Sequence, residues 1–289
     1  MGALLLRTMV RTGDLTCSYT QKRHKEGIEK MDHSERIRQE FAKQASAFGE
    51  QGLTLSSQEY LAWMVKTLPL QGDFRVLDVA AGTAHLSCAI APHVEHVIAF
   101  DMTPEMLDEA RHAIATKGLQ NVRCEEGDAA QLPYDDNSFD LVVSRLALHH
   151  FTAPQVQLGE MVRVCKPGQM VGAIDLLSPD DEALRDRYNH LERLRDPSHT
   201  TALTRTQVIR SMQEAGLSMT LVDTRDIPVD FHRWVAMTGT DPQTTATIQQ
   251  ALEQELDGGP ATGMRPYQER DVLGFLQVWA VLIGTKASQ

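Results

Sequence analysis

Two carboxylates and a run of small residues have the spacing that a nucleoside site requires. Asp78 ends a short apolar run and is closely followed by A-A-G-T-A, residues 80–84, while Asp101 ends the next apolar run. Gly82 has no Cβ and accepts a positive φ, so a ligand can lie directly against the backbone of this turn. A carboxylate at the end of the second strand can accept hydrogen bonds from both hydroxyls of a ribose. The pattern therefore indicates a nucleoside site.

The chemistry of the turn favours one kind of nucleoside over another. A dinucleotide site usually carries G-x-G-x-x-G, whereas this turn reads A-A-G-T-A-H, and Asp78 would repel an incoming pyrophosphate. A cationic, zwitterionic amino-acid group would not be repelled. S-adenosylmethionine therefore fits the turn better than NAD. Asp78 has two interpretations that remain open, direct contact with the cofactor or support of the turn through backbone hydrogen bonds.

Alternating strands and helices are needed to position these residues. Apolar runs and turn signals predict strands over 76–79, 96–100, 122–125, 139–144, 169–176, 217–223 and 274–284. Helices are predicted over 34–48, 56–67, 85–90, 104–116, 154–165, 184–194, 205–215 and 244–256. This alternation is typical of a parallel sheet with helices on both faces, which binds ligands at the carboxyl ends of its strands.

Three regions are expected along the chain. Residues 1–30 are mixed and basic and predict a poorly ordered leader, which could be dispensable; acidic residues count against a targeting peptide. Residues 31–70 predict an N-terminal helical lid. Residues 71–289 predict the main domain, with cap insertions at about 178–203 and 226–270.

Composition limits the class of protein and its partners. The chain has 289 residues, 42% of them hydrophobic and 23% charged, and a formal net charge of −11. This charge argues against nucleic acid and anionic membranes as general partners, and no apolar run is long enough to span a bilayer. The four cysteines are scattered without C-x-x-C spacing, which predicts a reducing, cytoplasmic location. A monomer and a homodimer are both compatible with these features.

Four stretches carry a resemblance to a known family. They are VLDVAAGTAHLS at 76–87, VIAFDMTPEMLDEA at 97–110, GDAAQLPYDDNSFDLVVSRLALHHF at 127–151 and EMVRVCKPGQMVGAID at 160–175. On these residues the chain resembles the class I S-adenosylmethionine-dependent methyltransferases of the ubiquinone/menaquinone-biosynthesis type (methyltransferase type 11). The resemblance implies an α/β fold with a doubly wound, mostly parallel seven-stranded sheet, and S-adenosyl-L-methionine as cofactor.

The same resemblance implies roles for individual residues. The turn residues would pass under the methionine and ribose, Asp101 would bind the ribose hydroxyls, and others would contact adenine or face the cofactor. The implied cofactor-binding residues are Asp78, Ala80, Gly82, Thr83, Asp101, Met102, Met106, Asp128, Ala129, Arg145 and Leu146. Ala80 and Ala84 stand where the family commonly has glycine, which adds only methyl groups to the turn.

Candidates for the methyl acceptor's site come from polar and aromatic residues near the predicted carboxyl edge. His149 and His150 follow the fourth strand, where one of them could be a general base or contact the acceptor. Candidate substrate contacts are Phe48, His85, Arg195, His199 and Trp234. His85 could instead belong only to the helix start, and the R-D-P-S-H segment at 195–199 has the composition of a surface loop. No acidic spacing fits a metal site.

The sequence therefore predicts S-adenosylmethionine-dependent methyl transfer to a small organic acceptor. The acceptor and the atom methylated, O, C, N or S, are left open. Two alternatives remain: a non-catalytic S-adenosylmethionine-binding sensor or partner subunit, and an NAD-dependent oxidoreductase, for which a glycine-richer turn would be expected.

Overall fold

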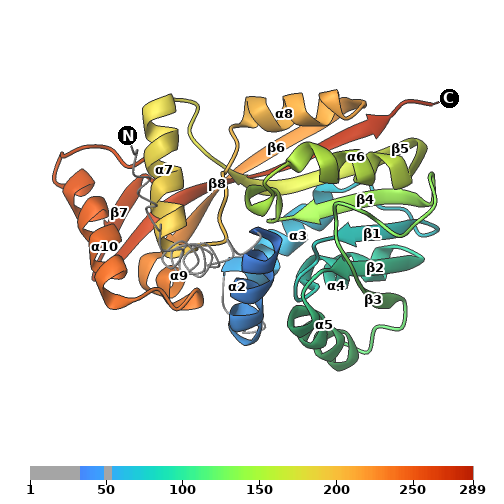
Figure 1. Ribbon diagram of the computed structural model, residues 1–289, viewed down its shortest axis with the longest axis horizontal. Helices are drawn as coiled ribbons and strands as arrows, with labels where there is room; N and C mark the ends of the chain where they lie inside the picture. The colour runs from blue at the N-terminus through green and yellow to red at the C-terminus, as the bar shows by residue number, and fades with distance from the viewer. Residues whose placement is uncertain (1–32, 49–53, 289) are drawn as a thin grey trace, which may run out of the picture.

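The computed structural model describes residues 33–48 and 54–288, and Figure 1 shows their arrangement. The predicted leader over 1–30 lies outside the described residues. The side chain of Phe48, at the end of the first described helix, is also outside them.

A single mostly parallel sheet runs through the molecule in the order β3-β2-β1-β4-β5-β8-β6, with β7 paired to β8. Strands β1 to β5 pair in parallel, whereas β8 is antiparallel to β5, β6 and β7. This confirms the predicted doubly wound, mostly parallel sheet and adds one short strand. The strands are β1 (Arg75–Val79), β2 (His96–Asp101), β3 (Val122–Glu126), β4 (Phe139–Arg145), β5 (Cys165–Leu177), β6 (Leu217–Asp230), β7 (Pro266–Glu269) and β8 (Val272–Lys286).

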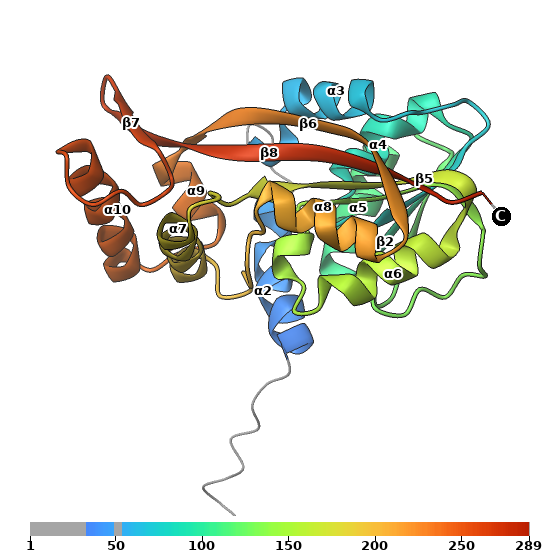
Figure 2. The same cartoon turned by 90° about the horizontal axis from the view of Figure 1, so that it is seen from above.

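Helices cover both faces of the sheet (Figures 1 and 2). Helices α3, α4 and α5 pack on one face and α6 and α8 on the other, while α7, α9 and α10 lie with β7 at one end and form the cap. The helices are α2 (His33–Phe48), α3 (Gln58–Thr67), α4 (His85–Ile90), α5 (Pro104–Thr116), α6 (Pro154–Val164), α7 (Glu182–Arg195), α8 (Arg205–Glu214), α9 (Phe231–Met237) and α10 (Pro242–Leu256), with short 3-10 helices η1 (Thr54–Ser56), η2 (Ala91–His93) and η3 (Leu148–His150).

The apolar runs of the strands divide between two hydrophobic cores. In β1, Val76 packs into the core under α3 to α5, and its neighbour Leu77 packs into the core under α6 and α8. Alternate residues of a strand point to opposite faces, so a parallel sheet covered on both sides needs continuous apolar runs. This physical requirement explains why the sequence pattern located these strands well.

The chain order places the ligand edge between β1 and β4. Strands β2 and β3 lie on one side of β1, and the next two strands in the chain, β4 and β5, lie on its other side. The crevice at such a reversal lies outside the carboxyl ends of the strands and is where open α/β sheets bind ligands. In Figure 1 these carboxyl ends face α2 and the cap. The site therefore lies between the carboxyl ends of β1, β2 and β4 on one side and the cap on the other.

Strand β6 is longer than the sequence predicts. The predicted strand ended at Asp223, but β6 continues to Asp230 and pairs with β8 along this whole extension. The extension is polar and contains Pro228, features usually typical of a loop. An edge strand tolerates both, because one of its sides has no neighbouring strand to pair with. The residues assigned to the cap from 226 onward therefore begin as strand.

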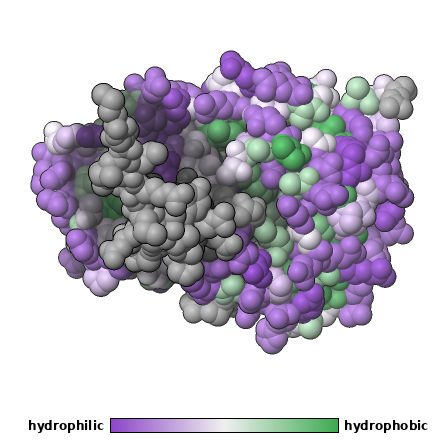
Figure 3. Space-filling model, viewed as in Figure 1, coloured by the Kyte–Doolittle hydropathy of each residue, from purple (hydrophilic) through white to green (hydrophobic). Residues whose placement is uncertain are grey.

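Polar residues dominate the described part of the face that Figure 3 shows. In the view of Figure 3, hydrophilic residues cover most of the visible described surface, and hydrophobic residues show only in small groups. The exposed large hydrophobic residues among the described ones are Val156, Val222, Leu256 and Val272. Within residues 33–48 and 54–288, no helix combines the length and apolar character that crossing a membrane requires.

Candidate active site

The turn after β1 is held against the end of β2 by a carboxylate. Asp101 Oδ2 accepts a hydrogen bond from the Gly82 amide at 2.8 Å, and Oδ1 accepts one from the Thr103 amide at 2.9 Å. Burial raises the pKa of Asp101, and these backbone hydrogen bonds act in the opposite direction. A Cβ built on Gly82 would have no atom within 4 Å, so this residue faces open space. The turn is therefore shaped for close approach of a ligand.

Two alanines of this turn adopt the left-handed conformation that glycine favours. Ala80 has φ of 55° and Ala84 has φ of 59°. The left-handed conformation costs an L-residue about 1–2 kcal/mol, and such strain often accompanies functional sites. The alanines therefore add strain as well as the methyl groups expected from the sequence.

A pocket opens over this turn, and we call it the donor pocket. Of the residues expected to bind a cofactor, all except Asp78 line it. They are Ala80, Gly82, Thr83, Asp101, Met102, Met106, Asp128, Ala129, Arg145 and Leu146. Ile37 and Phe41 of α2 line the same pocket. The structure thus brings together segments from β1, β2, β4 and the N-terminal helix.

Asp78 has a different position from the one expected for a cofactor contact. Its side chain is fully buried, accepts a hydrogen bond from Ser87 Oγ at 2.6 Å, and does not line the donor pocket. Burial raises its pKa to about 6. Asp78 therefore links β1 to α4 beneath the turn through a side-chain hydroxyl, and its direct contact with the cofactor stays a prediction.

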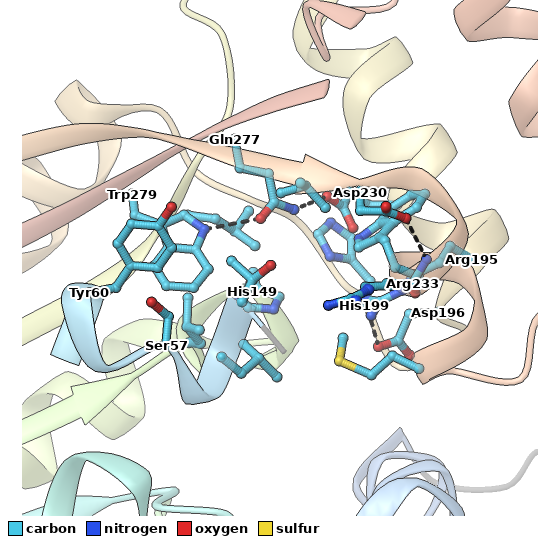
Figure 4. Close-up of a pocket in the computed structure, with 18 of the residues that line it drawn as sticks. Ser57, Tyr60, His149, Arg195, Asp196, His199, Asp230, Arg233, Gln277 and Trp279 are labelled. Carbon is cyan, nitrogen blue, oxygen red and sulfur yellow. Dashed lines mark hydrogen bonds and ion pairs between the residues drawn. The ribbon is translucent and has the colours of Figure 1, made fainter. Parts of the chain in front are cut away.

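A second cavity of about 310 Å³ adjoins the donor pocket, and we call it the acceptor cavity. Phe41, Leu55, Leu146 and His150 line both. Figure 4 shows Tyr60 and Trp279 on one side of the acceptor cavity and a polar group that includes Arg195 and His199 on the other. The volume suits a small organic molecule.

Leu146 stands at the junction of the two spaces in an unusual backbone conformation. It follows the last residue of β4, has φ of 53°, and its amide donates to the Ile174 carbonyl at 2.7 Å. Its neighbour Arg145 donates to the Leu55 carbonyl at 2.7 Å, and burial lowers the pKa of this arginine to about 10. The chain is thus fixed at the strained residue and at the residue before it.

His149 carries the arrangement of a positioned base. Its Nδ1 lies 2.5 Å from Asp175 Oδ1, and both side chains are buried at the end of the parallel strands. Burial lowers the pKa of His149, but the charge and hydrogen bond of Asp175 outweigh this and raise it overall. The Asp175 contact leaves Nε2 as the ring nitrogen available for an acceptor. Asp175 was not anticipated as a site residue, although it lies one residue before the end of the fifth predicted strand, 169–176.

His150 and His199 have environments that keep them neutral. Burial and the nearby His149, whose ring centroid lies 4.1 Å from that of His150, together lower the pKa of His150 to about 4. Burial also lowers the pKa of His199, whose Nε2 lies 2.8 Å from Asn189 Oδ1. Of the two candidate bases, His149 is therefore the better placed, and His150 lies between the donor pocket and the acceptor cavity.

The R-D-P-S-H segment is buried except at Pro197, which corrects its interpretation as a surface loop. Arg195, Asp196 and His199 are 9%, 3% and 4% exposed. The next residue, Thr200, donates from its amide to the His149 carbonyl at 2.8 Å and from Oγ1 to the His150 carbonyl at 2.9 Å. These two hydrogen bonds hold the end of the segment against His149 and His150.

The remaining acceptor candidates fall in different places. Trp234, on α9, lines the acceptor cavity as expected, together with Arg195 and His199. His85 begins α4 and lines the donor pocket, so it does not reach the acceptor cavity. The side chain of Phe48 lies outside the described residues.

Several cavity residues were not identified from the sequence. Trp279 and Gln277 of β8 line the cavity, and the Trp279 Nε1 donates to Gln277 Oε1 at 3.0 Å. Gln277 Nε2 in turn donates to Glu192 of α7 at 2.9 Å. The sequence signal that could have identified these residues is Gln277, a polar residue within an otherwise apolar predicted strand. Within the described part of the chain, no group of three or more histidine, cysteine or acidic residues could hold a metal ion.

Sequence and structure comparisons agree with this architecture. The doubly wound sheet with a pocket at its carboxyl edge is the Rossmann-like fold of class I methyltransferases. A family model described as a methyltransferase domain matches residues 76–168. YcgJ of Bacillus subtilis (strain 168), described as an uncharacterized methyltransferase, is 33% identical over 202 residues, which cover 69% of this chain and 79% of YcgJ. The chain belongs to this methyltransferase family and is an enzyme.

Two further similarities extend the comparison. The solved structure of Bacillus subtilis YcgJ aligns with a TM-score of 0.73 and 28% identity, covering 81% of this chain and all (100%) of that one. The demethylmenaquinone methyltransferase of Clavibacter sepedonicus is 34% identical over 153 residues, which cover 52% of this chain and 61% of that protein. Residues 76–168, which the family model matches, include every donor-pocket residue from Ala80 onward.

Proposed function

We propose that this enzyme transfers the methyl group of S-adenosyl-L-methionine to a small organic acceptor. One observation carries the proposal: the donor pocket over the small-residue turn and a separate cavity of about 310 Å³ share the residues at their junction. A methyl transfer needs a donor and an acceptor held side by side in an aligned pair. The family membership favours this reaction over a non-catalytic sensor and over an NAD-dependent oxidoreductase.

The residues of the donor pocket fit the cofactor. The open space over Gly82 accommodates a ligand against the backbone, and the Asp101 carboxylate lies beside it to accept hydroxyl hydrogen bonds. Ala80, Gly82 and Thr83 would support the methionine and ribose. Met102 and Met106 would contact the adenine, with Asp128 and Ala129 at its amino edge and Arg145 and Leu146 facing the cofactor.

The protein's own contribution to the reaction is alignment, exclusion of water and, for some acceptors, removal of a proton. S-adenosylmethionine supplies a methyl group that its positive sulfur already activates. Leu146 and His150 lie where the two spaces meet and would fix the acceptor's approach. His149, oriented by Asp175, would take a proton from an acceptor hydroxyl, thiol or carbon acid. An acceptor that attacks with a lone pair and loses no proton needs no base.

The cysteines are consistent with a reaction in the cytoplasm. Cys88, Cys124 and Cys165 are free thiols in the described chain, and burial raises the pKa of Cys88 to about 11 and that of Cys165 to about 12. Such protonated, buried thiols are structural rather than reactive.

Isothermal titration calorimetry with S-adenosylmethionine and S-adenosylhomocysteine tests the cofactor assignment. We expect the wild type to bind both, and Asp101→Asn to weaken binding about ten-fold or more, since hydrogen bonds to a charged group contribute about 1.5–3 kcal/mol. Asp108→Asn is the matched control, because Asp108 is exposed on α5 and pairs only with Arg111 among the interactions found for it.

Two results would contradict the cofactor assignment. One is unchanged affinity in an Asp101→Asn protein whose thermal unfolding matches the wild type. The other, which needs no variant, is wild-type protein that gives no heat with either compound but binds NADH in a fluorescence titration. The second result would support the oxidoreductase instead.

A further inference from the structure

Two hydrogen-bond donors are buried beside the acceptor cavity without partners. Arg195 Nη2 and Trp234 Nε1 make no hydrogen bond with any described residue. Both residues line the acceptor cavity, and they are 9% and 5% exposed. An unsatisfied buried donor costs about 1–3 kcal/mol, and more when the group is charged. A pair of such donors on one wall therefore indicates a ligand that supplies the missing acceptors.

The rest of the Arg195 side chain is fixed in place. Its Nε donates to the Trp234 carbonyl at 3.2 Å, and its guanidinium carbon lies 5.1 Å from the centroid of the Trp234 ring. Its Nη1 lies 3.8 Å from Asp196 Oδ2. These contacts join the end of α7 to α9 and leave Nη2 as the unused donor. Figure 4 shows Arg195 on the polar side of the cavity, opposite Trp279.

Both unused groups can only donate, so the complementary ligand group must accept. A carboxylate presents two acceptor oxygens and matches the planar guanidinium, whereas an ammonium group has no acceptor to offer. We propose that the methyl acceptor carries a carboxylate that binds Arg195 Nη2 and Trp234 Nε1. This inference rests on the proposed function, because it assigns the second cavity to the acceptor.

The charges around the cavity are compatible with a bound carboxylate. Asp196 Oδ2 lies 3.8 Å from Arg195 Nη1 and offsets part of the Arg195 charge, while Asp196 Oδ1 accepts hydrogen bonds from the amide and the hydroxyl of Ser198. Burial raises the pKa of Glu192, which favours its neutral form. Asp230 Oδ1 accepts from the Arg233 amide at the start of α9. The carboxylate would thus be held mainly by directed hydrogen bonds.

The shape of the cavity adds a second requirement for the acceptor. Its other wall is formed by Tyr60 and Trp279, and His149 lies between this wall and the polar one (Figure 4); Leu176 also lines the cavity. Aromatic and aliphatic surfaces favour an apolar body. The acceptor we infer is therefore a small carboxylic acid with an apolar or aromatic body, whose methylated atom lies on the side of Leu146 and His150.

Matched carboxylates and amides test this inference directly. We would titrate S-adenosylhomocysteine-loaded protein with phenylacetate and 4-hydroxybenzoate, and with phenylacetamide and 4-hydroxybenzamide, by calorimetry. The wild type is expected to bind the carboxylates about ten-fold tighter than the amides, because charged hydrogen bonds contribute about 1.5–3 kcal/mol. Arg195→Gln should abolish this preference. Trp234→Phe, which keeps a ring but removes the N–H, should reduce it several-fold.

The control is Trp63→Phe. Trp63 donates to Asp223 Oδ2 at 2.7 Å and does not line the acceptor cavity, so its variant should keep the full preference. If Arg195→Gln fails to fold, Trp234→Phe alone decides the question, with thermal unfolding as the check of its fold.

Four outcomes separate this inference from the proposed function. Suppose that the protein binds S-adenosylhomocysteine. If it then binds the amides as tightly as the carboxylates, or does not bind the carboxylates at all, only the inference is overturned. A carboxylate preference that survives in a folded Trp234→Phe protein at full strength would also overturn it. Wild-type protein that does not bind S-adenosylhomocysteine would overturn the proposed function instead.

Discussion

His149 and His150 are adjacent in the chain and have opposite electrostatic environments. Asp175 raises the pKa of His149 against burial, whereas burial and His149 lower the pKa of His150 to about 4. Pairs of titratable groups with separated pKa values often mark acid and base roles. At the residue scale, this separation is the reason why we propose His149 as the proton acceptor and His150 as a contact residue.

Asp175→Asn should lower the pKa of His149. The substitution removes the charge that raises this pKa and leaves burial, which lowers it. His149 must be deprotonated to accept a proton, so in the variant its basic form should appear at a lower pH than in the wild type. Nitrogen-15 NMR of labelled histidine across pH 5 to 9 measures this without an identified acceptor. Asp186→Asn, at an exposed position of α7, is the control.

The same change has a predicted effect on stability. A histidine with a raised folded-state pKa stabilises the fold below its unfolded pKa, and this contribution is lost as pH rises through the folded pKa. Asp175→Asn should therefore destabilise the protein more at pH 5.5 than at pH 8.5. An unchanged His149 titration, or a larger stability loss at the higher pH, would contradict the role assigned to Asp175.

The sequence predicted some of these residues well for a physical reason. Asp101 and Gly82 could be found because a strand end and a tight turn are local features, and both line the donor pocket. Asp78 could not be placed, since its hydrogen bond to Ser87 depends on how α4 packs. The burial of Arg195 and His199 was missed because it comes from contacts with segments such as α9 and η3, which local composition does not reveal.

At the scale of elements, the acceptor side is built from the segments that sequence pattern predicted least well. The extended part of β6, the helix α9 and the strand β7 were not expected, and β6 and α9 contribute Val229, Asp230 and Trp234 to the acceptor cavity. The polar, proline-containing extension of β6 is stabilised by pairing with β8, a partner about 50 residues away in the chain. Periodicity within a short window cannot detect such a partner.

A substitution at Gly263 tests how closely the segment before β7 packs against α7. It has φ of 83°, and a Cβ there would lie 2.8 Å from the Leu184 carbonyl oxygen of α7. Gly263→Ala should lower the free energy of unfolding by about 2–4 kcal/mol, because left-handed strain and a clash with backbone add together. Chemical denaturation measures the change.

A matched substitution should act in the opposite direction. Gly159 is an exposed residue within α6, where an added Cβ would meet no atom within 4 Å. Gly159→Ala should stabilise the protein by about 0.5–1 kcal/mol, since glycine is unfavourable in a helix interior. Equal effects at the two positions would contradict the close packing of the segment before β7 against α7.

At the scale of the whole molecule, the order of the strands brings two halves of the site together at the carboxyl edge of the sheet. The sequence pattern predicts one half and does not predict the other. Strands β1, β2 and β4 carry the donor pocket, and their neighbours β5, β8 and β6 carry the cap and the acceptor cavity. The donor half follows from short, buried apolar runs that any parallel sheet of this kind needs. The acceptor half depends on long-range pairing, and this division explains why the sequence indicated a methyl donor and left the acceptor open.

Methyl transfer itself is the most direct test of the account. Wild-type protein, Asp101→Asn and the control Asp108→Asn would each be incubated with S-adenosylmethionine labelled in its methyl group and a fractionated cell extract, followed by mass spectrometry of the labelled products. We predict a labelled small organic molecule with wild type and Asp108→Asn, and a loss of about ten-fold or more in its formation with Asp101→Asn. Label that appears only in macromolecules, or no transferred label in any fraction, would contradict small-molecule methyl transfer.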